Sequence, residues 1–492
     1  MDKSEEIQNK LPDSTQNLGI GCSFNDISHV VQPKLSWNIL NTRRFMITIL
    51  GMIGFVNVYT LRSSLSVAIV AMTAKTNHTL QNGTMTPVQE FTWTSEQQGI
   101  ILSSFFYGYV WTQIIGGVLA AKFGGNIFFG IGIGVSSVFM MISPLAAKHG
   151  LYYFITVRIL IGLCQGAIYS SMQEVLANWS PRYERTAISS FVHAGAQMGT
   201  FVSFLLSGLF ADRFGWESIF YIFGSLGVIW YILWAYLVKR RPSTDPRITT
   251  AEKNYIESNV DASNIYRKDI PWITLFTSKP VIALTIADLC EAWSNFTFLS
   301  MIPRFLTDVL KSDLGTTGIL AAAPYLIHIV FSAGVGISSD YLRSRNILTT
   351  QQVRKVMIGF GFTICAILTV IMASLNDPAA IIACLILTIS FSALMKVAIR
   401  CNALDFAPDY CSIIMGIVTT FGSISGTIAP IVAGYIVKTG SHDEWKIVFY
   451  ISASFCILGM IVFTAFGQGT IQSWAKPIKP NSLQREVTSE GL

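Results

Sequence analysis

The position of Arg62 points to a chemical role. Arg62 lies inside the apolar stretch "FVNVYTLRSSLSVAIVAM", which runs from Phe55 to Met72. Placing an arginine at the centre of a bilayer costs about 2.5–3.5 kcal/mol on insertion scales. A guanidinium stays charged at any working pH and pairs with a carboxylate or a phosphate at two points. We therefore expect Arg62 to hold an anionic substrate, the alternative being a structural arginine or one that reaches toward an interface.

Two acids lie in a second apolar stretch. Asp288 and Glu291 are three residues apart, so on a helix they would share one face. They could bind Na⁺ or a proton, or neutralise Arg62 when no substrate is present. A purely structural ion pair is the alternative. These acids are therefore candidates for coupling transport to a cation.

Other polar residues in apolar stretches have weaker signals. Arg158 precedes Gly162 and Gly166, whose spacing allows close helix packing. His193 could carry a proton, although a buried histidine is often only a hydrogen-bonded packing residue. Lys396 and Arg400 are expected to extend toward the cytosolic interface. Side chains that could contact a substrate, or simply pack, are Tyr59, Tyr107, Tyr109, Gln113 and Gln197.

The elements that position these residues are long apolar segments. The chain of 492 residues is 51% hydrophobic and 13% charged, whereas soluble proteins carry about 25% charged residues. Each apolar segment is long enough for a helix to cross about 30 Å of hydrocarbon. The sequence predicts an all-α membrane protein of twelve transmembrane helices. The segments start near Phe45, Gly99, Ile127, Leu151, Ala187, Ser218, Val281, Gly315, Val356, Ala379, Ser412 and Ile447.

Charge distribution predicts the orientation. Lysines and arginines gather in the loops that would share one side, above all in the long loop after the sixth segment, so both termini are expected in the cytosol. The glycosylation sequons at Asn77 and Asn82 fall in the first loop, on the opposite side. The expected organisation is a tail over 1–43, bundles over 44–238 and 276–467, a linker loop over 239–275 and a tail over 468–492.

The two halves of the chain resemble each other. "WESIFYI" starts at Trp216 and "WKIVFYI" at Trp445, an offset of 229 residues. Pro181, Gly195 and Gly199 correspond to Pro408, Gly422 and Gly426 at an offset of 227. A shared offset indicates a duplicated six-helix bundle, the architecture of major-facilitator transporters, in which substrate binds between the halves. The segments "GGVLAAKFGGN" and "GISSDYLRSRN" resemble the gating motif of that fold and supply Lys122, Asp340 and Arg343 as gating candidates.

Several further segments resemble the anion–cation symporter family, which includes sialin, the type I sodium-phosphate cotransporters and the vesicular glutamate transporters. They are "NVYTLRSSLSVAIVAM", "SSFFYGYVWTQIIGG", "AGAQMGTF", "LDFAP" and "QSWAKP", in matching order from about Arg44 to Lys476. The resemblance implies that Arg62 matches the arginine that engages the substrate anion and that Arg158 matches the helix-4 arginine involved in coupling.

The chain departs from that family at four positions. It has Ile161 and Gln165 where sialin-like members carry acids, and Glu291 and Leu102 where vesicular glutamate transporters carry an arginine and a histidine. These departures disfavour glutamate transport and favour the sodium-phosphate branch.

We therefore expect a secondary active transporter of phosphate or a small organic anion, coupled to Na⁺. The alternatives are an H⁺-coupled sialin-like exporter of acidic sugars or organic anions, a neutral-solute carrier, or a membrane receptor that transports nothing. No HExxH, GxSxG or P-loop motif and no cysteine–histidine cluster with zinc spacing occurs in the sequence, so no enzyme activity, metal or cofactor is expected beyond the coupling ion. We expect a monomer in the plasma membrane or a lysosomal or vesicular membrane, with no nucleic-acid partner.

Overall fold

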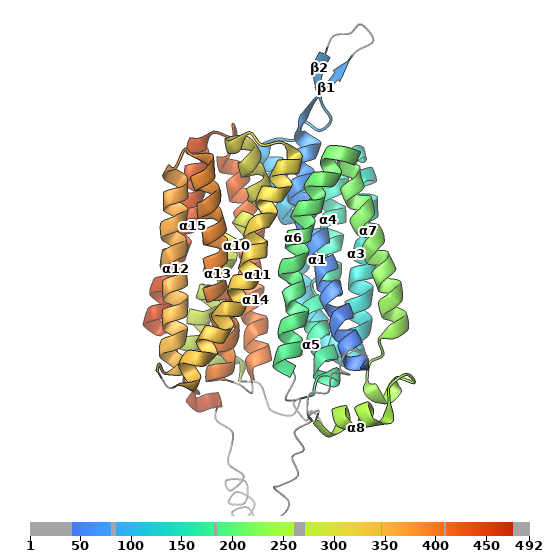
Figure 1. Cartoon of the computed structure of the whole chain (residues 1–492), viewed down its shortest axis with the longest axis vertical. Helices are drawn as coiled ribbons and strands as arrows, with labels where there is room; N and C mark the ends of the chain where they lie inside the picture. Colours follow the sequence, from blue (N-terminus) through green and yellow to red (C-terminus); the bar gives the residue numbers. More distant parts are fainter. Residues whose placement is uncertain are drawn as a thin grey trace, which may run out of the picture. The chain divides into compact units, whose positions relative to one another are not determined.

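The computed structural model describes residues 42–79, 85–181, 185–259, 271–345, 347–407 and 410–475. These residues form a body of long helices with one hairpin at its end (Figure 1). Among them, ten helices are long and apolar enough to cross a membrane. Two more, α2 (Ser95–Phe123) and α10 (Lys279–Leu310), are 29 and 32 residues long. The twelve predicted spans are therefore all helices.

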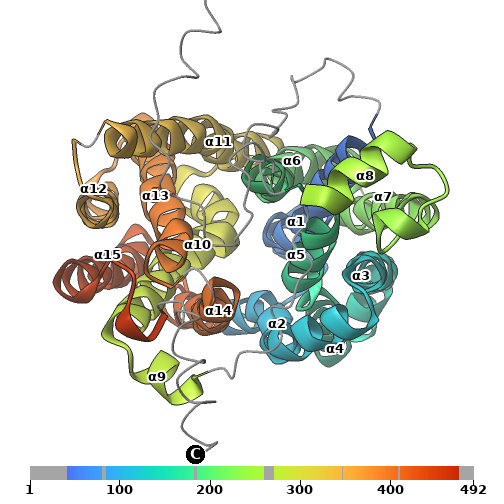
Figure 2. The ribbon, with the colours of Figure 1, turned by 90° about the horizontal axis from the view of Figure 1, so that it is seen from below.

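The helices form two groups of six spans that lie side by side (Figure 2). In the first group one span is broken at Gly166 and Ala167 into α4 and α5. The N-terminal bundle, besides α2, consists of α1 (Arg43–Thr73), α3 (Gly125–His149), α4 (Leu151–Gln165), α5 (Ile168–Trp179), α6 (Arg185–Phe214) and α7 (Trp216–Leu237). The C-terminal bundle, besides α10, consists of α11 (Leu314–Ser344), α12 (Thr350–Ser374), α13 (Pro378–Phe406), α14 (Cys411–Ile436) and α15 (His442–Phe466).

The connections lie at opposite ends of this body. The antiparallel strands β1 (Lys75–Thr79) and β2 (Met85–Gln89) project from one end, and α8 (Thr250–Asn259) lies at the other (Figure 1). The linker was expected to be a loop, but it contains a short 3₁₀ turn (Pro242–Thr244), α8 and α9 (Trp272–Thr277). Glu252 of α8 accepts hydrogen bonds from the backbone N–H groups of Arg43 and Arg44, at 3.1 and 3.0 Å, and so caps the start of α1. A last 3₁₀ turn spans Ser473–Ala475.

Several helices begin earlier than the apolar pattern predicted, because polar residues start them. Thr94 and Gln97 form a reciprocal capping box before α2, whose predicted start was Gly99. Ser441 and Glu444 do the same for α15, whose predicted start was Ile447. Hydropathy detects only the lipid-buried part of a span and misses the first turns.

The duplication is visible in the helix packing. In the N-terminal bundle, Gly195 brings α6 against α1, since a β-carbon there would collide with the carbonyl oxygen of Met52. In the C-terminal bundle, Gly422 brings α14 against α10, where a β-carbon would collide with the carboxylate of Asp288. The corresponding glycines therefore hold corresponding helix pairs together.

The bundles pack tightly against each other at the end that carries the hairpin. There α6 meets α11 at Gly208 and Gly318, where a β-carbon on either glycine would lie 2.8 Å from the Cα of the other. Arg304 donates to the Ser95 hydroxyl at 2.7 Å and to the carbonyl of Val437 at 3.0 Å. We call these contacts the hairpin-end seal. The ribbons of α6 and α11 diverge toward the other end (Figure 1).

The outer surface of the helices is apolar. On α7, Ile229, Ile232 and Leu233 are 56%, 61% and 48% exposed, and similar side chains cover the outside of α12. An apolar surface of this extent is unsuited to water and suited to lipid. The chain is an integral, multi-pass membrane protein.

Candidate functional site

Arg62 lies among five aromatic rings. Its guanidinium carbon is between 4.5 and 5.7 Å from each ring centroid. The rings, which we call the aromatic cage, belong to Tyr59, Phe105, Phe106, Tyr109 and Phe296. Four come from the N-terminal bundle, and Phe296 comes from α10 of the C-terminal bundle. The cage therefore spans both bundles and depends on their relative position.

Arg62 has no acidic partner among the residues that the structure describes. Within the described part of the chain, Arg62 makes no ion pair, and its Nε and Nη2 atoms are buried without a hydrogen-bond partner. Each cation–π contact stabilises the buried guanidinium by about 0.5–2 kcal/mol. The ring faces do not, however, accept the hydrogen bonds that the guanidinium N–H groups can donate. A buried, unsatisfied charged donor is costly, so the site favours an anion that would accept those hydrogen bonds. Neutralisation of Arg62 by Asp288 or Glu291 was one of the alternatives left open by the sequence. Among the described residues neither acid pairs with Arg62, and Glu291 pairs with Lys396 instead.

Arg158 is a second buried guanidinium without an acidic partner among the described residues, and it lies near the Phe105 ring of the aromatic cage. It is 1% exposed, its Nε has no partner, and Nη1 has only the sulfur of Met140 at 4.0 Å. Its guanidinium carbon lies 6.0 Å from the Phe105 ring, which also faces Arg62. Close packing of α2 on α4 at Gly162 and Gly166 brings Phe105 to this position, as the glycine spacing predicted.

Tyrosine hydroxyls continue the site away from the cage. The hydroxyls of Tyr59 and Tyr169 lie 2.9 Å apart. The His193 ring stacks on Tyr169 with centroids 5.7 Å apart, and its Nδ1 donates to the Ser189 carbonyl at 2.7 Å. With Nδ1 donating to this carbonyl, Nε2 is the ring atom that could take up a further proton, and it lies 3.5 Å from the amide nitrogen of Gln173. Tyr169 was not singled out from the sequence, where nothing distinguished it from other tyrosines in apolar segments.

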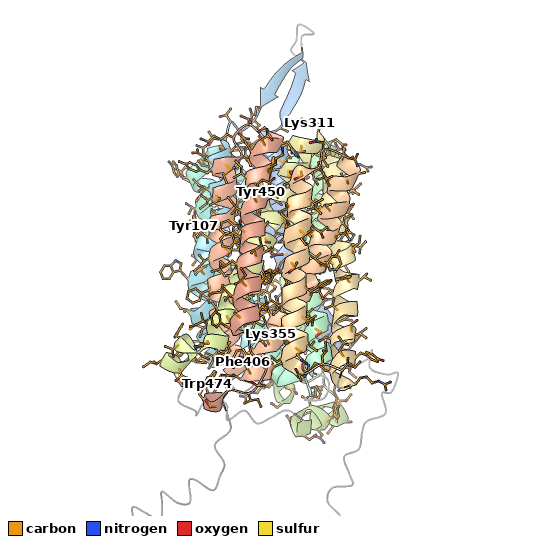
Figure 3. All side chains as sticks on the ribbon, turned by 90° about the vertical axis from the view of Figure 1, so that its left-hand side faces the viewer. Tyr107, Lys311, Lys355, Phe406, Tyr450 and Trp474 are labelled. Carbon is orange, nitrogen blue, oxygen red and sulfur yellow. The ribbon has the colours of Figure 1, made fainter. Side chains whose placement is uncertain are left out.

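The other side chains predicted to contact a substrate do not all lie near the aromatic cage. Tyr107 receives a hydrogen bond from Ser103 of its own helix at 3.1 Å and lies at the outer edge of the molecule (Figure 3), so it stands apart from the cage. Gln113 donates to Ser423 of the C-terminal bundle at 3.0 Å and thus joins the bundles. Gln197 is partly buried and has no hydrogen-bond partner among the described residues.

The acids of α10 face two different helices. Glu291 is 7% exposed and lies 3.5 Å from the Lys396 ammonium, which also donates to the Asn295 amide oxygen at 2.7 Å. Asp288 instead lies against Gly422 of α14. The prediction that Lys396 extends to the cytosolic interface is therefore wrong. A small cavity beside the pair has a mixed lining. Its polar residues are Glu291, Ser294, Asn295, Thr369, Thr388 and Ser392, and the rest of its lining consists of Phe298, Tyr325, Cys365, Ile389, Met395 and Cys456.

The predicted gating residues lie at the end opposite the hairpin. Lys122 is exposed and packs over Phe123, while the side chain of Asp340 lies outside the described part of the structure. Arg343 is 3.9 Å from the carboxylate of Asp405, which pairs more closely with Arg354 at 2.7 Å. Sequence reasoning missed Asp405 and Arg354, although a charged pair near helix ends was a usable signal.

The other predicted features are placed as follows. Asn77 lies in β1 at the hairpin end, and Asn82 lies outside the described residues. A second buried histidine, His328 of α11, is 3% exposed, and its Nδ1 donates to the carbonyl of Ile389 at 2.8 Å, so it is a packing residue held by the backbone. Across the described ranges, no group of three or more histidines, cysteines or acids could hold a metal ion.

Known proteins resemble this chain over most of its length. The family model "Major Facilitator Superfamily" matches residues 51–409 and 350–483. Sialin from Ovis aries is 36% identical over 451 residues, which cover 88% of this chain and 90% of the relative. Vesicular glutamate transporter 3 from Danio rerio is 34% identical, with 96% and 84% covered. Sialin from Homo sapiens is 33% identical, with 88% and 90% covered.

Solved structures share the fold. A bacterial homologue of the human lysosomal transporter Spinster, inward-facing and occupied, superposes with a TM-score of 0.66 at 11% identity, covering 86% of this chain and 96% of that one. The xylose transporter XylE from E. coli, in a partially occluded inward-open conformation, gives 0.63 at 13% identity, with 88% and 99% covered. At such identities the likeness concerns the fold alone.

Proposed function

Because the chain belongs to the major facilitator superfamily and, within it, to the anion–cation symporter family of sialin and the vesicular glutamate transporters, we propose that it carries inorganic phosphate or a small organic anion across a membrane. It is a transporter that works by alternating access. The single observation that carries the choice of an anion is the uncompensated guanidinium of Arg62 between the bundles. A neutral solute would leave its N–H groups without a charged partner.

The cage provides a physical link between binding and movement. An anion that binds to Arg62 would weaken the cation–π interactions between the guanidinium and the five rings. One of these rings, Phe296, belongs to the C-terminal bundle. Rocking of the bundles would separate Phe296 from the other four rings. The protein with a bound anion and the empty protein would then favour different arrangements of the two bundles. Such a difference is what links substrate binding to alternating access.

We propose Na⁺ as the coupling ion. The helix-4 positions expected to carry acids in a proton-coupled relative are occupied by Ile161, which is fully buried, and Gln165, which donates to Ser136 at 3.3 Å. Oxygen atoms that a hard cation could use are instead those of Glu291 and Asn295 in the C-terminal bundle, which in this structure contact the Lys396 ammonium. Proton coupling is the second candidate, and it is supported by His193, whose Nε2 beside Gln173 could take up a proton while Nδ1 donates to the Ser189 carbonyl.

We also propose that the hairpin end faces the lumen or the extracellular space. Both sequons fall in the segment between α1 and α2, and the basic linker with α8 lies at the opposite end. A mobility shift on endoglycosidase treatment, lost in Asn77→Gln/Asn82→Gln, supports this orientation. An unchanged mobility in wild type contradicts glycosylation at these sites.

Uptake by the purified full chain in liposomes tests the function. The probes are labelled phosphate, a labelled dicarboxylate and labelled glucose, each under an imposed Na⁺ gradient or an imposed pH gradient. We expect one of the anions, and no glucose, to accumulate, with stimulation by inward Na⁺. Glucose uptake without anion uptake contradicts the proposal, and stimulation only by a pH gradient overturns Na⁺ coupling in favour of H⁺.

A further inference from the structure

Arg400 is a charged side chain that the site described so far does not use. It lies one helical turn beyond Lys396 on α13. Lys396 is held by Glu291 and Asn295, whereas Arg400 has no hydrogen bond or ion pair with any described residue, and much of its side chain is exposed. A guanidinium at membrane depth costs about 2.5–3.5 kcal/mol. A free one therefore suggests a ligand rather than a structural role.

The surroundings of Arg400 place it between the bundles rather than against lipid. It interacts electrostatically with Tyr59 of α1 and Tyr169 of α5, both in the N-terminal bundle. From its own bundle it is within electrostatic range of Asp288 and Glu291. Glu291 pairs with Lys396, whereas Asp288 makes no ion pair among the described residues. Since much of Arg400 is nevertheless exposed, the described part of the protein does not fill the space in front of it.

The groups facing Arg400 are suited to an anion. Tyr59 and Tyr169 share one hydrogen bond at 2.9 Å, so one of the two hydroxyl protons remains free to donate. Tyr59 also contributes a ring of the cage, with its centroid 5.7 Å from the guanidinium carbon of Arg62. Arg62 of the N-terminal bundle thus lies against the Tyr59 ring, and Arg400 of the C-terminal bundle is within electrostatic range of both tyrosines. Neither guanidinium forms an ion pair with an acid among the described residues.

We propose that Arg400 is a second anion contact, and that the substrate is held between Arg62 and Arg400 with the Tyr59–Tyr169 pair beside it. This inference rests on the proposed function and specifies the substrate class. Two separate cations select a substrate with two negative charges over one with a single charge. Because each cation belongs to a different bundle, a bound dianion also draws the bundles together.

The first test measures accessibility and occupancy of Arg400 directly. The purified full chain is treated with phenylglyoxal, which modifies arginine, and the modified peptides are identified by mass spectrometry. We expect Arg400 to react and succinate to slow its modification at least threefold, while acetate at equal concentration has little effect. Exposed Arg213 serves as the internal control and should react equally with either anion present. An Arg400 that does not react, or that reacts equally with succinate and acetate present, overturns the proposal.

The second test is transport in liposomes. We expect Arg400→Gln to lower uptake of labelled succinate and phosphate at least tenfold and to leave uptake of any transported monoanion, such as lactate, within twofold. Arg62→Gln should lower all of them, and Arg213→Gln none. If wild type carries anions and Arg400→Gln carries the dianions normally, the second contact is refuted while the proposed function stands. If wild type carries no anion, the proposed function fails, and this inference fails with it.

Arg400→Lys distinguishes charge from packing. A lysine keeps the positive charge but loses the two-point geometry of the guanidinium. We expect the lysine variant to retain more succinate uptake than Arg400→Gln at equal protein content. Equal losses in both variants, with normal thermal unfolding, contradict an electrostatic role.

Discussion

Phe106 of α2 and Phe296 of α10 meet with ring centroids 4.8 Å apart, and the guanidinium carbon of Arg62 lies 4.5 and 4.8 Å from the same two centroids. One arginine thus lies against both sides of the interface between the bundles. Any rearrangement that separates the two rings changes the environment of the charge. This relationship connects the binding site with the conformational change.

A substitution at Gly426, which packs against the Phe106 ring, tests the role of the aromatic cage. A β-carbon at this position of α14 would collide with the Phe106 ring. Gly426→Ala should therefore displace the ring, at a cost of about 1–3 kcal/mol typical of overpacking, and lower anion uptake roughly tenfold. Gly416→Ala on the same helix is the matched control, because nothing lies within 4 Å of the added carbon. Equal uptake by the two variants would show that the position of Phe106 is unimportant.

The Glu291–Lys396 pair should behave as a unit in stability measurements. Removing one partner of a buried pair costs about 3–5 kcal/mol, because the other charge is left unpaired. We expect Glu291→Gln and Lys396→Met each to lower the midpoint of thermal unfolding in detergent. The double variant should be more stable than either single one. Additive losses in the double variant would exclude an energetic coupling between the two side chains.

Glu291 should also affect the ion dependence of transport. Neutralising this carboxylate removes a charged oxygen ligand from the proposed cation site, so Glu291→Gln should need a higher Na⁺ concentration for half-maximal uptake. Exposed Glu257 on α8 provides the control substitution, Glu257→Gln. Identical Na⁺ and pH profiles for Glu291→Gln and wild type would refute a coupling role.

The hairpin-end seal should be sensitive to side-chain size. Gly208→Val would force α6 away from Gly318, 2.8 Å from the added carbon, whereas Gly334→Val on α11 meets nothing within 4 Å. In a Ser207→Cys background, we expect a membrane-impermeant maleimide to label the buried position 207 faster with Gly208→Val than with Gly334→Val. Equal labelling rates would show that the seal does not depend on this contact.

Much of the fold could be predicted from the sequence, because lipid imposes a strong pattern on it. Long apolar runs revealed the twelve spans, and the shared offset of Gly199 and Gly426 revealed the duplication. Arg62 was recognisable because a charge in an apolar run is costly. The family is confirmed by the comparisons.

The partners of each charge could not be predicted, because hydropathy does not tell which way a side chain points into a bundle. Asp288 and Glu291 were expected to face Arg62 together, yet Glu291 pairs with Lys396 about a hundred residues away and Asp288 lies against α14. The role of Phe296 in the cage could not be predicted, because the sequence does not distinguish it from the other phenylalanines in apolar segments. Contacts between distant helices required the structure.

Anion uptake by Arg62→Ala tests the central claim most directly. The variant is compared with Arg62→Lys and wild type in liposomes, at equal protein content and with matched thermal unfolding. We predict that Arg62→Ala abolishes uptake of the transported anion and that Arg62→Lys retains a small fraction of it, because a point charge replaces part of the guanidinium's role. Uptake by a folded Arg62→Ala at the wild-type rate would contradict the account.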